Sequence, residues 1–291
     1  MNSQNFTRKK SQNITRKKNN LIPKFVPTEY IGEYDSQNLR TGFGILKWAN
    51  GCSLKGYFKK GKINGWGILT FSNNDIYRGE FVDDKANGYG EYVYKNGKIK
   101  MGYWKDDSLN GVGYLFNDSD EMNYIGEFKN SEKNGVGILE TEDKDIEYEG
   151  EWRNNNFHGF GIHYYENGNQ YYGNWKNNYK NGYGEYIWLG GQKYMGYFKN
   201  DKKNGFGLYY LLNETYHIGF WEKGKLDGIV KIFIGIEFKY GIWKQGKKEK
   251  IFLDENELKN NKEYNGDKNE VLSKISFDFI KIFMNIKDEE E

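Results

Sequence analysis

Few residues in this sequence combine the type and spacing that catalysis needs. The chain has three histidines, His158, His163 and His217, and one cysteine, Cys52. Acid–base catalysis needs a positioned partner for the histidine, and a zinc site needs clustered Cys and His ligands. Neither arrangement can be recognised. His163 and His217 fall at positions of a repeating pattern, so we interpret both as structural and Cys52 as a small buried or half-buried residue.

The paired glycines, such as Gly42 and Gly44, could suggest a nucleotide site. A dinucleotide fingerprint also needs a third glycine and a surrounding βαβ unit, and the sequence supplies neither. The carboxylates are scattered, and no nucleophile elbow, P-loop or kinase motif occurs. We therefore predict no catalytic, cofactor-binding or metal-binding residues, and a protein that is not an enzyme.

The glycines mark a repeat of about 23 residues. Gly-x-Gly pairs begin at 42, 65, 88, 111, 135, 159, 182 and 205. A second series of ten glycines has an aromatic residue two positions after each one: Tyr34, Phe58, Phe81, Trp104, Phe128, Trp152, Trp175, Phe198, Trp221 and Trp243. Six copies also have tyrosine two positions before: Tyr30, Tyr77, Tyr124, Tyr148, Tyr171 and Tyr194.

Both glycine patterns have a period of two, which predicts two strands per unit, each with glycines and rings on one face. A ring can lie over a glycine on the adjoining strand, where no side chain stands. Asn-Gly pairs such as Asn50-Gly51 predict two-residue type I′ turns between units. The connection inside a unit, for example residues 59–64, is expected to be a longer polar loop.

This pattern resembles the MORN (membrane occupation and recognition nexus) repeat family. Residues 171–175, Tyr-Tyr-Gly-Asn-Trp, followed by Gly-Tyr-Gly at 182–184, match its unit closely. The resemblance covers residues 30–245 and implies an all-β fold, an elongated single-layer antiparallel sheet of hairpin repeats. We expect a repeat domain at 29–249, with units starting near 30, 54, 77, 100, 124, 148, 171, 194, 217 and 239. It lies between a basic tail at 1–28 and a linker and C-terminal helix at 250–291.

The overall composition suits a thin, well-hydrated structure. Aromatic residues make up 18% of the chain and hydrophobic residues only 37%, while the net charge is +2. Flat rings cover apolar area without a thick interior. The N-terminus has no apolar signal-peptide core, and no apolar run is long enough for a membrane span. We therefore expect a cytoplasmic protein.

The two ends differ from the repeats in charge. Residues 1–28 contain seven basic residues and no acid. We expect this tail to be disordered, and either simply solvated or docked on an anionic surface such as a membrane. The docking residues would be Arg8, Lys9, Lys10, Arg16, Lys17 and Lys18. Apolar residues recur at spacings of three and four over 268–287, which predicts an amphipathic helix. We expect it to pack on its own sheet, with a partner or a membrane surface as alternatives.

The resemblance implies a scaffold or adaptor that binds partner proteins in a cytoskeletal, ciliary or membrane–cytoskeleton assembly. We predict a protein-binding groove lined by Tyr77, Trp104, Tyr124, Tyr148, Trp152, Tyr171, Trp175 and Tyr194. Each ring could instead be core, and the first-position tyrosines, which we expect to be exposed, are the better contact candidates. The alternatives are a phospholipid-binding module that tethers to membranes, and a regulatory piece of a lipid kinase or methyltransferase assembly. Nucleic acid is not expected as a partner, and the open sheet edges leave homo-oligomers possible.

Overall fold

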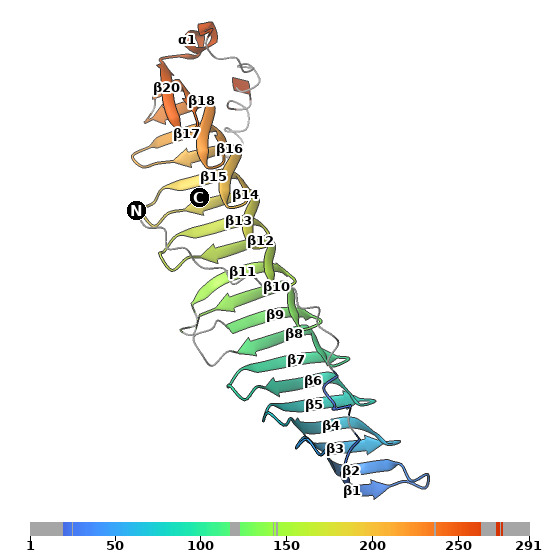
Figure 1. Cartoon of the computed structure of the whole chain (residues 1–291). Helices are drawn as coiled ribbons and strands as arrows, with labels where there is room; N and C mark the ends of the chain where they lie inside the picture. The colour runs from blue at the N-terminus through green and yellow to red at the C-terminus, as the bar shows by residue number, and fades with distance from the viewer. Residues whose placement is uncertain are drawn as a thin grey trace, which may run out of the picture. The chain divides into compact units, whose positions relative to one another are not determined.

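The computed structural model describes residues 20–24, 26–116, 123–141, 143, 145–235, 237–262, 272, 273 and 275 (Figure 1). Twenty strands belong to one antiparallel sheet, which confirms the all-β hairpin-repeat fold. The chain forms two compact units, residues 1–110 and 111–291. The basic residues of the N-terminal tail, from Arg8 to Lys18, lie outside the described residues.

In the first unit each strand pairs with the next one along the chain. Figure 1 shows these strands alternating in direction, as consecutive hairpins require. The strands are β1 Glu29–Tyr34, β2 Arg40–Lys47, β3 Ser53–Lys59, β4 Lys62–Thr70, β5 Ile76–Val82, β6 Lys85–Val93 and β7 Ile99–Lys105. Strand β8, Ser108–Phe116, contains the boundary between the two units.

The second unit continues the same consecutive pairing, from β8 with β9 to β19 with β20. Its strands are β9 Asn123–Lys129, β10 Glu132–Glu140, β11 Ile146–Arg153, β12 Asn156–Tyr164, β13 Gln170–Lys176, β14 Tyr179–Ile187, β15 Lys193–Lys199, β16 Lys202–Tyr210, β17 Thr215–Glu222, β18 Lys225–Ile234, β19 Glu237–Lys244 and β20 Lys247–Phe252. A short helix, α1 Glu255–Asn260, follows. The sequence patterns did not predict it, although Asp254 caps it by accepting a hydrogen bond from the Glu257 N–H at 2.8 Å.

A row of facing glycines runs across the strands of each unit. In the second unit, Gly150 pairs with Gly161, which pairs with Gly173, which pairs with Gly184. Beside this row the pairing register shifts, because the second strand of each 23-residue repeat carries extra residues. The first glycine of each Gly-x-Gly lies at this bulge with positive φ, as Gly182 does at 100°. Glycine reaches that backbone region without a steric penalty.

The two kinds of turn are the reverse of the sequence prediction. From the second repeat on, the two strands of a repeat are joined by two residues, both with positive φ, such as Asn177 at 51° and Asn178 at 65°. This is the conformation of a type I′ turn, which Asn and Asp tolerate. Between successive repeats the turn is wider. The Trp48 N–H donates to the Cys52 carbonyl at 3.1 Å, and Gly51 is in the left-handed region with a φ of 87°. The glycine of Asn-Gly thus occupies the last position of a three-residue loop.

The two-residue turns also join successive repeats. The Asn178 side chain accepts a hydrogen bond from the Phe157 N–H at 2.7 Å, and the Asn178 N–H donates to the Phe157 carbonyl at 3.1 Å. Asp201 holds Lys180 in the same way, with distances of 2.8 and 3.1 Å. Each turn therefore satisfies both backbone groups of a residue about one repeat earlier, at a point where its pairing with the following strand has ended.

Candidate functional site

The rings predicted to line a groove form a buried layer on one face of the sheet. The eight residues Tyr77, Trp104, Tyr124, Tyr148, Trp152, Tyr171, Trp175 and Tyr194 have exposed fractions of 0–6%. The expectation that the first-position tyrosines are exposed is therefore wrong. The strands curl at the bulge, and each ring is covered by its neighbours.

Contacts between rings bring most of the predicted residues together. In the first unit the Tyr77 and Trp104 ring centroids are 5.1 Å apart. In the second unit Trp152 is 5.2 Å from both Tyr124 and Tyr148. These pairs are edge-to-face, the arrangement that aromatic quadrupoles favour.

Hydrogen bonds satisfy the polar atoms of the buried rings. The Tyr171 hydroxyl donates to the Asn174 carbonyl at 3.0 Å, and the Trp175 indole N–H donates to the Gly161 carbonyl at 3.2 Å. Burial raises the pKa of Tyr171 well above its ordinary value, so its hydroxyl stays protonated and keeps donating. The layer is therefore the core of a one-sheet protein, and partners must approach the groups beside it.

One repeat position differs in chemistry from copy to copy. Two residues before the Gly-x-Gly, the first unit carries Arg40, which is half-buried, and then Ile63, Ala86 and Leu109, all fully buried. At the same position the second unit carries Lys133, Phe157, Lys180 and Lys203, each half-buried. The sequence signal was present, because lysine replaces apolar residues there in three copies.

Lys180 and Lys203 lie among rings that remain partly exposed. We call Lys180, Lys203, Tyr165, Tyr186, Trp188 and Tyr209 the lysine–ring cluster. Lys180 Nζ is 4.6 Å from the Tyr186 centroid and donates to the Tyr165 hydroxyl at 3.1 Å. Lys203 Nζ is 3.8 Å from the Tyr209 centroid and 4.9 Å from that of Trp188. Ring faces stabilise ammonium groups at these distances.

Burial changes the ionisation of both lysines. Desolvation lowers the pKa of Lys180 to about 8, although Asp201 nearby opposes the change. Desolvation also lowers the pKa of Lys203 to about 8. A carboxylate that reached either ammonium group would restore part of the lost electrostatic stabilisation. The cluster therefore holds two ammonium groups that are only partly hydrated.

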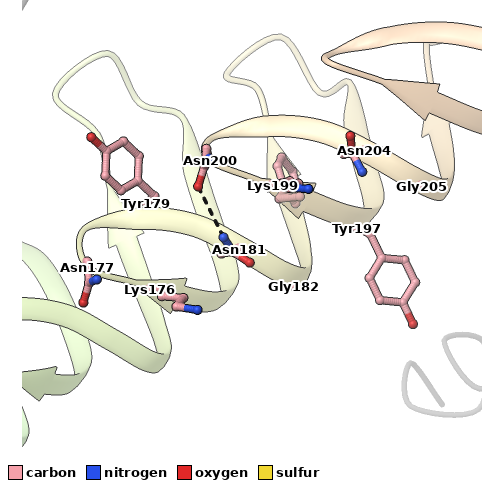
Figure 2. Close-up of a pocket in the computed structure, with 11 residues that line it drawn as sticks. Lys176, Asn177, Tyr179, Asn181, Gly182, Tyr197, Lys199, Asn200, Asn204 and Gly205 are labelled. Atoms are coloured by element: carbon pink, nitrogen blue, oxygen red, sulfur yellow. Dashed lines mark hydrogen bonds between the residues drawn. The ribbon is translucent and has the colours of Figure 1, made fainter.

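An open hollow of about 750 Å³ lies at the turn end of the same strands (Figure 2). Tyr179, Asn181, Tyr197 and Asn200 are among its lining residues, and the Asn181 amide donates to the Asn200 side chain at 3.5 Å. Figure 2 shows the Tyr179 and Tyr197 rings pointing away from this asparagine pair. The hollow offers amides and lysines for hydrogen bonding and no acid–base pair.

In the first unit, a segment before β1 lies across the strands. The Thr28 N–H donates to the Lys47 carbonyl on β2 at 2.8 Å. Seven residues earlier, the Leu21 N–H donates to the Asp107 carboxylate in the turn after β7. The segment therefore runs from β2 to the turn after β7, with bends of the chain at residues 21, 22, 24 and 28. Leu21, Ile22 and Pro23 are half-buried along it.

The histidines take part in local contacts. His163 is near the Glu147 carboxylate, with Nε2 to Oε1 at 3.2 Å, and its ring is 4.2 Å from that of Tyr165. Burial lowers the pKa of His217, whose ring is 6.0 Å from that of Trp243. Across the described ranges, no three His, Cys, Asp or Glu side chains gather where they could share a metal ion. Within the same residues, the helices are too short or too polar to span a bilayer.

Repeated hairpins with a ring layer on one face define a β-hairpin repeat protein. The family model for the MORN repeat matches residues 30–53, 55–76, 77–99, 124–146, 148–170, 171–193 and 194–213. The chain belongs to the MORN repeat family. No curated protein matches it in sequence.

Two solved structures are similar to this chain at low scores. One is a mutant of the TCP10 domain of Danio rerio CPAP, with 8% identity and a TM-score of 0.35, covering 65% of this chain and 86% of that one. The other is the TCP domain of Drosophila melanogaster SAS-4 in complex with a proline-rich motif of Ana2, with 13% identity and a TM-score of 0.27. That match covers 69% of this chain and 99% of the other. Neither similarity bears on function.

Proposed function

We propose that this protein is a non-catalytic scaffold that binds partner protein segments through partly exposed rings and lysines of its second unit. The contact groups are those of the lysine–ring cluster, above the buried layer that includes Tyr171 and Tyr194. The partner is an extended segment that carries carboxylates. Its setting is a cytoskeletal or ciliary assembly, or one at a membrane–cytoskeleton junction in the cytoplasm.

The spacing of the two ammonium groups carries this proposal. Lys180 and Lys203 occupy equivalent positions one repeat apart, on strands β14 and β16. Two strand spacings are about 10 Å, which is also the distance between residues i and i+3 of an extended chain. A segment running across the strands with an acid at every third residue would therefore pair with both lysines. Such a segment would stack its remaining atoms on the half-buried rings.

The first unit offers a comparison for the partner. Its own segment before β1 crosses the strands and is held at Thr28 and Leu21. In that unit three of the four copies are apolar at the equivalent position, and the crossing segment carries Leu21 and Ile22. In the second unit three copies carry lysine at this position, so the complementary segment is acidic.

A labelled peptide of four Glu-Pro-Pro repeats tests the proposal by fluorescence anisotropy, with Lys-Pro-Pro as its charge-reversed control. We expect K180M/K203M to weaken binding of the acidic peptide at least about tenfold, a loss of about 1.4 kcal/mol. The matched variant K176M/K199M removes two exposed lysines beside the hollow and should change affinity less than about twofold. Equal losses in the two variants, or equal affinity for both peptides, would overturn the proposal.

The N-terminal tail supplies a second contact in this proposal. Arg8, Lys9, Lys10, Arg16, Lys17 and Lys18 would tether the scaffold to an anionic surface, each contributing about 1 kcal/mol near an acidic bilayer. Sedimentation with phosphatidylserine vesicles should show binding that is lost when residues 1–20 are deleted. Binding that persists after the deletion would favour a lipid site on the sheet itself.

A further inference from the structure

A second surface lies on the face of the sheet opposite the ring layer. It consists of the middle residue of each Gly-x-Gly in the second unit, and of the hydrophobic residue that replaces it in the last copy. Because side chains alternate along a strand, these residues point away from the buried rings. We call Val112, Val136, Phe160, Tyr183, Phe206 and Ile229 the apolar stripe.

Exposure decreases along the apolar stripe toward the C-terminus. The exposed fractions are 61% for Val112, 61% for Val136, 55% for Phe160 and 40% for Tyr183. Phe206 is half-buried, and Ile229 is fully buried. Contiguous exposed apolar surface of this kind is a candidate site for a protein partner.

Helical residues of the same chain cover the buried end. Ile229 belongs to a core cluster with Leu258 of α1 and with Leu272 and Ile275, and Phe206 packs against this cluster. Residues 272, 273 and 275 are helical. This agrees with the prediction that a C-terminal helix packs on its own sheet, and the rest of that predicted helix lies outside the described residues. The apolar stripe therefore already accepts Leu and Ile side chains from helices at one end.

We propose that the exposed part of the apolar stripe, from Val112 to Tyr183, docks an amphipathic helix of a partner protein. The stripe provides one apolar residue per repeat, hence one about every 10 Å. A helix rises 1.5 Å per residue, so aliphatic residues seven apart recur about every 10.5 Å along it. Three repeats span about 29 Å, which matches a helix of about 19 residues.

Carboxylates beside the stripe select the charge of this helix. Glu127 pairs across strands with Val112, and Glu151 pairs with Val136. Each carboxylate is held in place by a backbone N–H: that of Val136 donates to Glu127 at 3.1 Å, and that of Phe160 donates to Glu151 at 2.8 Å. The partner helix therefore carries Lys or Arg beside its aliphatic face.

The probe for this surface is a labelled 21-residue peptide in which successive Leu residues are alternately three and four positions apart, with Lys at all other positions. Its control is the same pattern with Glu in place of Lys. We expect the Leu–Lys peptide to bind the full chain, and V136S/F160S to weaken that binding at least about tenfold. Both substitutions are at exposed positions, and circular dichroism would verify that the fold is kept. The control variant L189S removes an apolar side chain that is 76% exposed in a loop away from the stripe, and should leave affinity unchanged.

Several outcomes would overturn the assignment. These are no binding of the Leu–Lys peptide, equal binding to wild type and V136S/F160S, or stronger binding of the Leu–Glu peptide. A truncation after Ile275 that raises affinity at least about tenfold would assign the stripe to the chain's own C-terminal residues instead. A concentration-dependent dimer in sedimentation, lost in V136S/F160S, would assign it to a second copy. Because the lysine–ring cluster is on the other face, K180M/K203M should not affect this binding.

Discussion

The ring of Tyr148 lies over Gly161 on the neighbouring strand, and its hydroxyl occupies the space where a side chain at position 161 would begin. The hydroxyl donates to the Glu151 carbonyl at 2.9 Å. Tyr171 has the same relationship to Gly184. The glycine row and the ring layer are thus two halves of one packing arrangement, repeated along each unit.

We predict that Gly161→Ala destabilises the protein, because its Cβ would collide with the Tyr148 hydroxyl. Overpacking of this kind costs about 1–3 kcal/mol, measurable as a lower urea midpoint. Gly190→Ala is the control, since its Cβ would meet only the Gln192 side chain at 3.3 Å or more and its φ is not positive. A midpoint for Gly161→Ala equal to that of Gly190→Ala would refute the packing explanation.

Much of the fold could be predicted from residue spacing, because the period of two inside a 23-residue repeat determines both strand type and register. The facing pair Gly161 and Gly173, for instance, lies where the pattern places it. The burial of Tyr148 could not be predicted, because it depends on how far the strands curl at the bulge. The turns were misassigned because Asn-Gly suits both a type I′ turn and the last position of a wider loop.

The candidate site was harder to predict than the fold. The pattern singled out Tyr171 and Tyr194, which recur in many units, and recurrence marks what every unit needs for its core. Lys180 and Lys203 occur at a position where four other copies carry an apolar residue, so they depart from the commonest pattern. Their half-buried state, and the lowered pKa that follows, depend on rings of the same strand, Tyr186 and Tyr209, and on rings of the preceding repeat, Tyr165 and Trp188.

We predict that Asn178→Ala weakens the link between successive repeats. Alanine cannot accept the hydrogen bond from the Phe157 N–H, and it is strained at the positive φ of this turn. The combined cost should be about 1–3 kcal/mol. Asn178→Asp keeps the acceptor and tolerates this φ, and it loses only the bond that the Asn178 amide donates to the Asn156 side chain at 2.6 Å, so it should destabilise less than Asn178→Ala. Amide hydrogen exchange at Phe157 should accelerate in Asn178→Ala alone, and equal protection in both variants would contradict the role of this bond.

We predict that stability rises with pH between about 8 and 9.5, and that Lys180 and Lys203 cause the rise. Their pKa is about 8 in the folded protein, below the ordinary lysine value of about 10.4 expected after unfolding. In this window the unfolded chain binds more protons than the folded one, so the free energy of unfolding increases with pH. Urea titrations at several pH values should show a positive slope in wild type and a smaller one in K180M/K203M.

The control for this prediction is K176M/K199M, which should keep the wild-type slope. The window ends near pH 9.5 because burial also raises the pKa of tyrosines such as Tyr171. Above about pH 10 the unfolded tyrosines release protons that the folded ones retain, which lowers stability as pH rises. A flat wild-type profile from pH 8 to 9.5 would mean that the two lysines are not desolvated.

In the last full repeat, two substitutions test whether a first-position tyrosine needs a glycine on the facing strand. His217 stands where other units have the first-position tyrosine, and the residue facing Gly219 is Val230 instead of glycine. The Val230 side chain fills the space that a tyrosine hydroxyl would need. We therefore predict that His217→Tyr alone destabilises the protein, and that adding Val230→Gly recovers much of the loss. The coupling between the two substitutions should be about 1–3 kcal/mol.

A double-mutant cycle by urea denaturation measures this coupling. Val230→Gly alone should also destabilise, because it removes a buried side chain that packs with Ile232 and Trp243. Only the pair restores a tyrosine over a glycine, so the double variant should be more stable than the two single losses predict. The matched control pairs His217→Tyr with Leu189→Ser, a loop substitution that should add to its effect independently. Additive losses in the Val230→Gly cycle would show that the tyrosine does not depend on the facing glycine.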